Sequence, residues 1–223
     1  MHLERGNVPR SRPMLRRALR IATRHHLFER AAVAYHNLFA VEYLSGNWRL
    51  GEAYAVKALE LYPEGSVNRS RLARDLAYRT ILRGGFEEAL PLAREVLRHF
   101  TAPAERALVW SDIARAAGGA GDMDQFELAW AQAYLLVETE ILDPFTINVM
   151  LNLAHGAASR GDRHRAALMA ARAVQLATER NESGSVFEGE ALLGSLQASR
   201  PVIAQPTDPG RNSGAVIEAF SRC

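Results

Sequence analysis

The chain has 223 residues, of which 48% are hydrophobic, and its formal net charge is +2. No apolar run reaches the length of a membrane span, the arginine-rich start lacks the apolar stretch of a secretory signal, and the single cysteine, Cys223, excludes an intramolecular disulfide. We therefore expect a cytoplasmic protein that makes no contact with a membrane.

The first 24 residues are strongly basic. Residues 10–24 are predicted to form the second helix of a hairpin whose first helix is absent or reduced to residues 1–5. Pro9 and Pro13 stand near the start of this helix, where proline is tolerated. This basic start could contact nucleic acid, an acidic partner or a neighbouring domain. The alternative is an exposed helix face in an arginine-favouring genome, since the chain has one lysine beside 26 arginines. One acid, Glu4, accompanies seven arginines here: Arg5, Arg10, Arg12, Arg16, Arg17, Arg20 and Arg24.

Four pairs of helices are predicted to follow, because apolar residues recur at three- and four-residue steps. Residues 185–199 predict one further helix that caps the last pair, since the open end of an array exposes apolar surface. Residues 200–223 begin with several prolines and are expected to form a flexible tail. The eight paired helices are expected at 27–45, 48–61, 68–83, 86–99, 104–117, 122–140, 146–160 and 162–180.

A glycine recurs at the predicted turns, and small residues follow it at fixed distances. Gly6, Gly46, Gly84, Gly121 and Gly161 are 40, 38, 37 and 40 residues apart. Glycine adopts the positive φ that such turns often need. Small residues five, nine and twelve positions later share one helical stripe and permit close helix packing, although two aromatic residues interrupt the third unit. The period predicts an all-α array of helix hairpins, with Gly118–Gly121 as a turn.

One segment resembles the second half of a tetratricopeptide repeat. It runs from Gly46 to Pro63 and reads GNWRLGEAYAVKALELYP. That family favours glycine followed by aspartate at the turn, a small residue five positions later, and an Ala-Leu-Glu-Leu-x-Pro ending; Gly85–Leu90 and Gly161–Asp162 match parts of this pattern. The resemblance covers roughly residues 6–180. It implies a right-handed superhelical solenoid over residues 1–199 and a non-catalytic scaffold that binds a protein or peptide segment, such as the sensor part of a bacterial regulator.

The resemblance places the ligand on the concave face, along the first helix of each pair. The positions expected to be exposed there hold Asn, His, Arg, Asp and Tyr, whereas an exposed face without a function would be rich in Glu and Lys. Amide side chains bond to peptide backbone, and arginine grips carboxylates. Alternatively, the aspartates simply neutralise neighbouring arginines in weak surface pairs. The candidate groove residues are His36, Asn37, Arg71, Arg74, Asp75, Tyr78, Ser111, Asp112, Arg115, Asn148, Asn152 and His155.

No catalytic or metal motif accompanies these residues. His25, His26 and His36 match no zinc spacing, and neither a phosphate loop nor a nucleophile elbow is present. We expect no catalytic residue, no metal and no cofactor. Three alternatives remain: a transcription-linked regulator whose residues 5–24 contact nucleic acid, an enzyme with a perturbed titratable pair in a pocket, and self-association through an apolar edge at Leu15 and Leu19.

Overall fold

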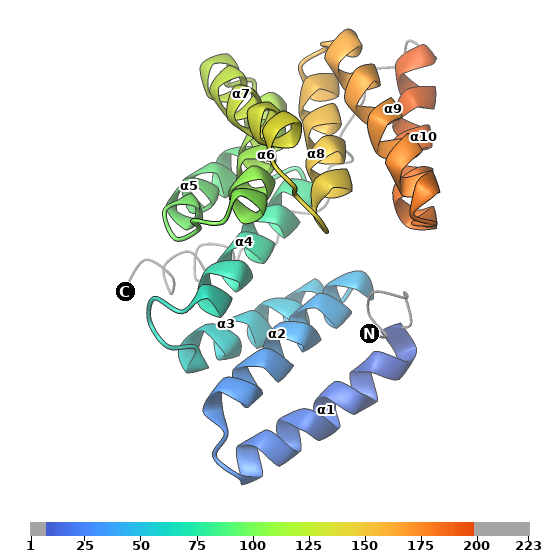
Figure 1. The fold of residues 1–223 in the computed structure, drawn as a ribbon. Helices are drawn as coiled ribbons and strands as arrows, with labels where there is room; N and C mark the ends of the chain where they lie inside the picture. The colour runs from blue at the N-terminus through green and yellow to red at the C-terminus, as the bar shows by residue number, and fades with distance from the viewer. Residues whose placement is uncertain (1–7, 199–223) are drawn as a thin grey trace. The chain divides into compact units, whose positions relative to one another are not determined.

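Residues 8–198 are described in a computed structural model, and they form ten α-helices (Figure 1). The predicted turn at Gly6 and the predicted tail at 200–223 lie outside these residues. None of the ten helices combines the length and the apolar character that crossing a bilayer requires. The helices are α1 Val8–Arg24, α2 Phe28–Leu44, α3 Trp48–Leu61, α4 Val67–Leu82, α5 Phe86–Leu97, α6 Pro103–Ala120, α7 Met123–Thr139, α8 Thr146–Ser159, α9 Arg163–Glu179 and α10 Ser183–Gln197.

The described residues fall into two compact units, which divide within α4. In the first unit, residues 8–76, α1 packs on α2 and α2 packs on α3. In the second unit, residues 77–198, α5 packs on α6, α6 on α7 and α8, and α9 lies between α8 and α10 (Figure 1). Consecutive helices are antiparallel, so the predicted all-α hairpins are confirmed.

Six of the described connections between helices close with the same backbone motif. The glycine φ angles at four of them lie between 75° and 84°. In each, the N–H that follows the positive-φ residue donates to the carbonyl five residues earlier, as Asn47 does to Glu42 at 2.8 Å. This is the Schellman arrangement, and it confirms the predicted turn glycines. The motif is centred on His26, Gly46, Gly84, Gly121, Gly161 and Asn181.

The small residues that follow the turns at Gly46, Gly84, Gly121 and Gly161 are buried, as their spacing predicts, whereas Ala18, twelve positions after Gly6, is exposed. The two aromatic residues that replace small residues after the Gly121 turn are buried too: Phe126 is wholly covered, and Trp130 is almost wholly covered. The Arg160 guanidinium lies 4.6 Å from the centre of the Phe126 ring, and the Arg165 guanidinium lies 5.0 Å from that of Trp130. Aromatic rings and arginine planes therefore fill the space that alanines fill elsewhere. The buried alanines are Ala55, Ala58, Ala89, Ala93, Ala133, Ala166, Ala170 and Ala173.

The predicted turn at Gly118–Gly121 starts too early, because α6 continues to Ala120. A Cβ atom on Gly118 would collide with the carbonyl oxygen of Gly156, and one on Gly156 would lie 2.7 Å from the carbonyl oxygen of Ala114. These glycines therefore serve the close approach of α6 and α8. Only Gly121 has the left-handed turn conformation.

Candidate functional site

A buried polar network joins α6 and α8 in the second unit. The Asn152 amide nitrogen donates to Asp112 Oδ1 at 2.7 Å and to Ser111 Oγ at 3.2 Å. Arg115 Nη1 donates to the Asn152 amide oxygen at 3.1 Å. Ser111, Asp112 and Asn152 are at most 1% exposed. Since the hydrogen bonds use both ends of the Asn152 amide, this side chain fixes the two helices relative to each other.

At its solvent-facing side the network reaches α10 through a carboxylate. His155 Nε2 and Glu188 Oε1 are 2.9 Å apart, and Arg115 Nη1 lies 3.9 Å from the same oxygen. The side chains of Arg115 and His155 are 13% and 20% exposed. We call Arg115, His155 and Glu188 the rim triad. It places a cation and an imidazole beside a carboxylate at the edge of the structure.

The electrostatics of the rim triad favour a neutral imidazole beside an ionised carboxylate. Burial, assisted by the Arg115 charge, lowers the pKa of His155, although Glu188 acts to raise it. The hydrogen bond with His155 lowers the pKa of Glu188 against the opposing effect of burial. Near neutral pH, His155 therefore donates its Nε2–H to Glu188. The Arg115 guanidinium supplies the remaining N–H donors of the triad, and these are suited to a second carboxylate.

Two further candidate residues belong to the second unit. Asn148 is exposed, and its spacing from Asn152 and His155 puts it on the same stripe of α8. Tyr78 is half-buried, and the Arg79 guanidinium lies 5.8 Å from the centre of its ring. Asn148 thus extends the accessible part of the candidate site along α8.

The first unit contains a separate cluster around His36. Its Nδ1 lies 3.2 Å from the Tyr62 hydroxyl, and its Nε2 lies 3.0 Å from Asp75 Oδ2. Arg74 Nη1 donates to the other Asp75 oxygen at 3.3 Å. Burial, and next the Asp75 charge, raise the pKa of Tyr62 to about 12. The phenol therefore keeps its proton, and the cluster links α2 to α4 and to the end of α3.

The two remaining candidates of the first unit differ in exposure. Asn37 is half-buried on α2, and Arg71 is exposed on α4. Five of the twelve candidates thus belong to the first unit, and seven belong to the second. Within each unit, candidates from successive first helices meet: His36 with Asp75, and Asp112 with Asn152.

Three candidates expected to be exposed, Ser111, Asp112 and Asn152, are buried instead. The close approach of α6 and α8 at Gly118 and Gly156 explains this, because it brings their polar stripes into direct contact. The polar side chains that the sequence pattern indicated as a ligand surface instead form hydrogen bonds between α6 and α8 at these three positions.

Sequence reasoning missed two residues that complete these clusters. Tyr62 stands immediately after α3, where the repeat pattern marks only the helix ending. Glu188 lies on α10, which the spacing indicated only as a cap. No periodicity singles out either residue. The visible signal for Glu188 is a carboxylate within a largely apolar helix.

The basic start divides into an internal and an external part. Arg12 donates twice to the buried Glu42 carboxylate, at 2.7 Å and 2.9 Å, and Asn47 donates to it at 2.8 Å. Burial alone would raise the pKa of Glu42, but these hydrogen bonds and the charge of Arg12 lower it. Arg12 therefore belongs to the fold. Four further arginines of α1 are exposed, and the last three of them follow at steps of three and four residues: Arg16, Arg17, Arg20 and Arg24.

No protein-family model matches the chain, and the search of curated proteins found no significant relative. Among residues 8–198, no three His, Cys, Asp or Glu side chains are grouped so that they could hold a metal ion.

Proposed function

We propose that the chain is a tetratricopeptide-like, right-handed solenoid that binds a peptide or protein segment without catalysing a reaction. The repeated Schellman turns, the buried small residues that follow them and the pairing of successive hairpins support this architecture. In such an array, side chains of the first helices form a continuous binding surface. In the second unit these helices are α6, α8 and α10.

The rim triad carries the functional part of the proposal. Arg115 and His155 have partly exposed donors, while the buried Asn152 bonds hold α6 and α8 in place. Side chains already fixed by packing lose little freedom when they bind, which favours affinity. A carboxylate on the peptide would compete with Glu188 for these donors, and Asn148 would contact the adjacent backbone. The expected ligand is therefore a peptide with an acidic side chain or a free C-terminus.

The test is selection of peptides from a random dodecapeptide library on the full chain, followed by anisotropy measurements with the enriched peptides. Asn148→Ala combined with His155→Gln should weaken binding at least about tenfold, which corresponds to about 1.4 kcal/mol. Arg94→Ala on exposed α5 surface is the matched control and should bind like the wild type. Circular dichroism checks that each variant keeps its helices. Failure to enrich any peptide, or equal loss in both variants, contradicts the proposal.

The second candidate is a transcription-linked regulator that contacts nucleic acid through α1. The four exposed arginines of this helix favour it. If all four neutralise phosphates of a DNA duplex, a plot of the logarithm of the binding constant against the logarithm of the salt concentration should have a slope of about −3.6. Arg17→Glu with Arg20→Glu should abolish this binding; a variant that retains it would exclude the candidate.

A further inference from the structure

The helices at the two ends of the described chain have opposite charge. All six ionisable side chains of α1 are arginines, whereas α10 contains two glutamates and neither arginine nor lysine. Of the glutamates, Glu190 is exposed, and Glu182 is exposed at the N-cap of α10. Opposite charges on two exposed helices attract each other and accelerate their encounter.

Both end helices also expose apolar side chains. On α1, Met14 is 57% exposed and Ile21 is 50% exposed, and their seven-residue spacing puts them on one stripe. Leu15 and Leu19, expected to form the apolar edge, are half-buried instead. They lie on the stripe that carries buried residues of α1, which explains the difference.

The outward side of α10 combines one large ring with small neighbours. Phe187 is 74% exposed. A Cβ atom on Gly184 or Gly194 would meet no other atom within 4 Å. Glycine within a helix costs about 1 kcal/mol relative to alanine, and nothing in the described chain uses the space beside these two. The Phe187 ring therefore projects from an open part of the α10 surface.

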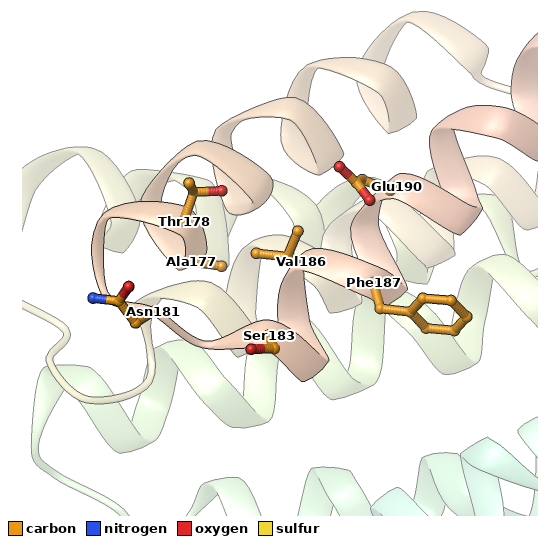
Figure 2. Close-up of a pocket in the computed structure, with 7 residues that line it drawn as sticks. All are labelled: Ala177, Thr178, Asn181, Ser183, Val186, Phe187 and Glu190. Atoms are coloured by element: carbon orange, nitrogen blue, oxygen red, sulfur yellow. The ribbon is translucent and has the colours of Figure 1, made fainter.

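A shallow pocket of about 350 Å³ lies beside Phe187, between the end of α9 and the start of α10. Figure 2 shows Val186 pointing toward α9, while the Phe187 ring points away from it. The pocket offers apolar carbons together with the Glu190 carboxylate. It is lined by Ala177, Thr178, Asn181, Ser183, Val186, Phe187 and Glu190.

We propose that α1 of one molecule docks on α10 of a second copy of this chain, head to tail. An apolar side chain of α1, Met14 or Ile21, enters the pocket beside Phe187, and the exposed arginines face Glu182 and Glu190. The two surfaces differ, so each molecule offers one of each. Such a head-to-tail interface adds further copies at both ends, into an open filament or a closed ring.

A second copy accounts for more of these observations than nucleic acid does. Phosphates would explain the arginines of α1, but they would leave the exposed ring, the pocket and the acidic side chains of α10 without a role. A second copy supplies a cationic and apolar surface for α10 and an anionic and apolar surface for α1. The proposal goes beyond peptide binding, because it uses residues outside the candidate groove.

The test is sedimentation velocity of the full chain over a range of concentrations, at about 0.05 M and about 0.5 M salt. Added salt screens exposed charges. The wild type should form species of increasing mass at low salt, and high salt should reduce them. Arg17→Glu with Arg20→Glu removes the α1 surface, and Phe187→Asp removes the α10 surface. Each variant alone should remain a monomer.

Mixing the two variants is the decisive measurement. Each retains the surface that the other has lost, so an equimolar mixture should form a dimer and stop there. Arg94→Glu and Leu135→Asp are exposed controls on α5 and α7 and should assemble like the wild type. Circular dichroism checks that all variants are folded. A wild type that stays monomeric, a mixture that stays monomeric, or a monomer that binds a DNA duplex through α1 would overturn the proposal.

Discussion

The two units of the chain handle charge differently. Residues 8–76 carry twelve arginine and lysine side chains against six carboxylates, whereas residues 77–198 carry eleven against sixteen. The first unit buries the Glu42 carboxylate and neutralises it with Arg12. The second joins α6 and α8 through the Asn152 amide, with Arg115 at its edge. The same turn motif thus recurs in both units, whereas the polar contacts between their helices differ.

The units also differ in how their helices approach each other. In the first, a Cβ atom on Gly51 would lie 3.0 Å from the Tyr43 ring, a side chain that can move. In the second, Gly118 and Gly156 set backbone against backbone. Close packing is therefore adjustable in one unit and rigid in the other. Three substitutions and one change of pH test this difference between the units.

Gly118→Ala should have the largest effect. The added methyl group would collide with the Gly156 carbonyl, so α6 and α8 must separate and strain the Asn152 bonds. We expect a loss of about 3 kcal/mol or more in the free energy of unfolding, at the upper end for overpacked sites. Urea unfolding measures it, with Gly51→Ala as the control, which should lose less. Equal losses would mean that the units do not differ in rigidity.

Glu42→Gln should have the next largest effect, and in the first unit. It leaves the Arg12 guanidinium without its carboxylate, although Arg12 is partly exposed and water can solvate it. Removing one partner of a buried pair costs about 3–5 kcal/mol, and partial exposure reduces this to about 2 kcal/mol. Unfolding can be followed by Trp48 fluorescence in a variant with phenylalanine at the other two tryptophans. Replacing both Arg12 and Glu42 by methionine should restore most of the stability.

Mild acid should affect the second unit before the first. The pKa of His155 is lower in the folded chain than in the unfolded chain, so the unfolded chain binds a proton at His155 at a higher pH. The contribution of neutral His155 to the free energy of unfolding is therefore lost as pH falls below about 6.5. The lowered pKa of Glu42 makes its contribution disappear only below about 4.3. Amide exchange measured between pH 7 and pH 5 should rise in α8 and α10 more than in α2. His155→Gln should remove this difference; its persistence would point to another titrating group.

Glu127→Gln should have the smallest effect. Hydrogen bonds from Arg165 and Arg160 lower the pKa of Glu127 to about 2. The carboxylate is nevertheless 49% exposed, and water screens such pairs. We expect a loss of less than about 1 kcal/mol, decreasing with added salt, measured as a shift in Tm. A loss as large as that of Glu42→Gln would show that exposure does not separate the two pairs.

Most of the helices could be predicted, because apolar spacing and turn glycines are local properties. The predicted 48–61 coincides with α3, and most other boundaries fall within two residues. The predicted end of α6 was wrong. Two consecutive glycines, Gly118 and Gly119, are typical of a turn, but here Gly118 allows α6 to pack closely against α8.

The polar partners could not be predicted, because they depend on how close two helices come. Periodicity places Asn152 and Asp112 on the first helices, but only the separation of α6 and α8 decides whether they meet water or each other. Glu188 reaches His155 from a helix 33 residues further along the chain, a distance at which no repeat signal relates the two.

The turns next to α1 and α10 affect how easily these two helices unfold locally. His26, before α2, and Asn181, before α10, adopt a left-handed conformation with side chains that tolerate it less well than glycine does. The strain lowers the free energy needed to detach α1 or α10, so their amide protons should exchange with solvent before those of α8. The described helices would then unfold from α1 and α10 inward. An encounter that covers an end helix would slow that fraying.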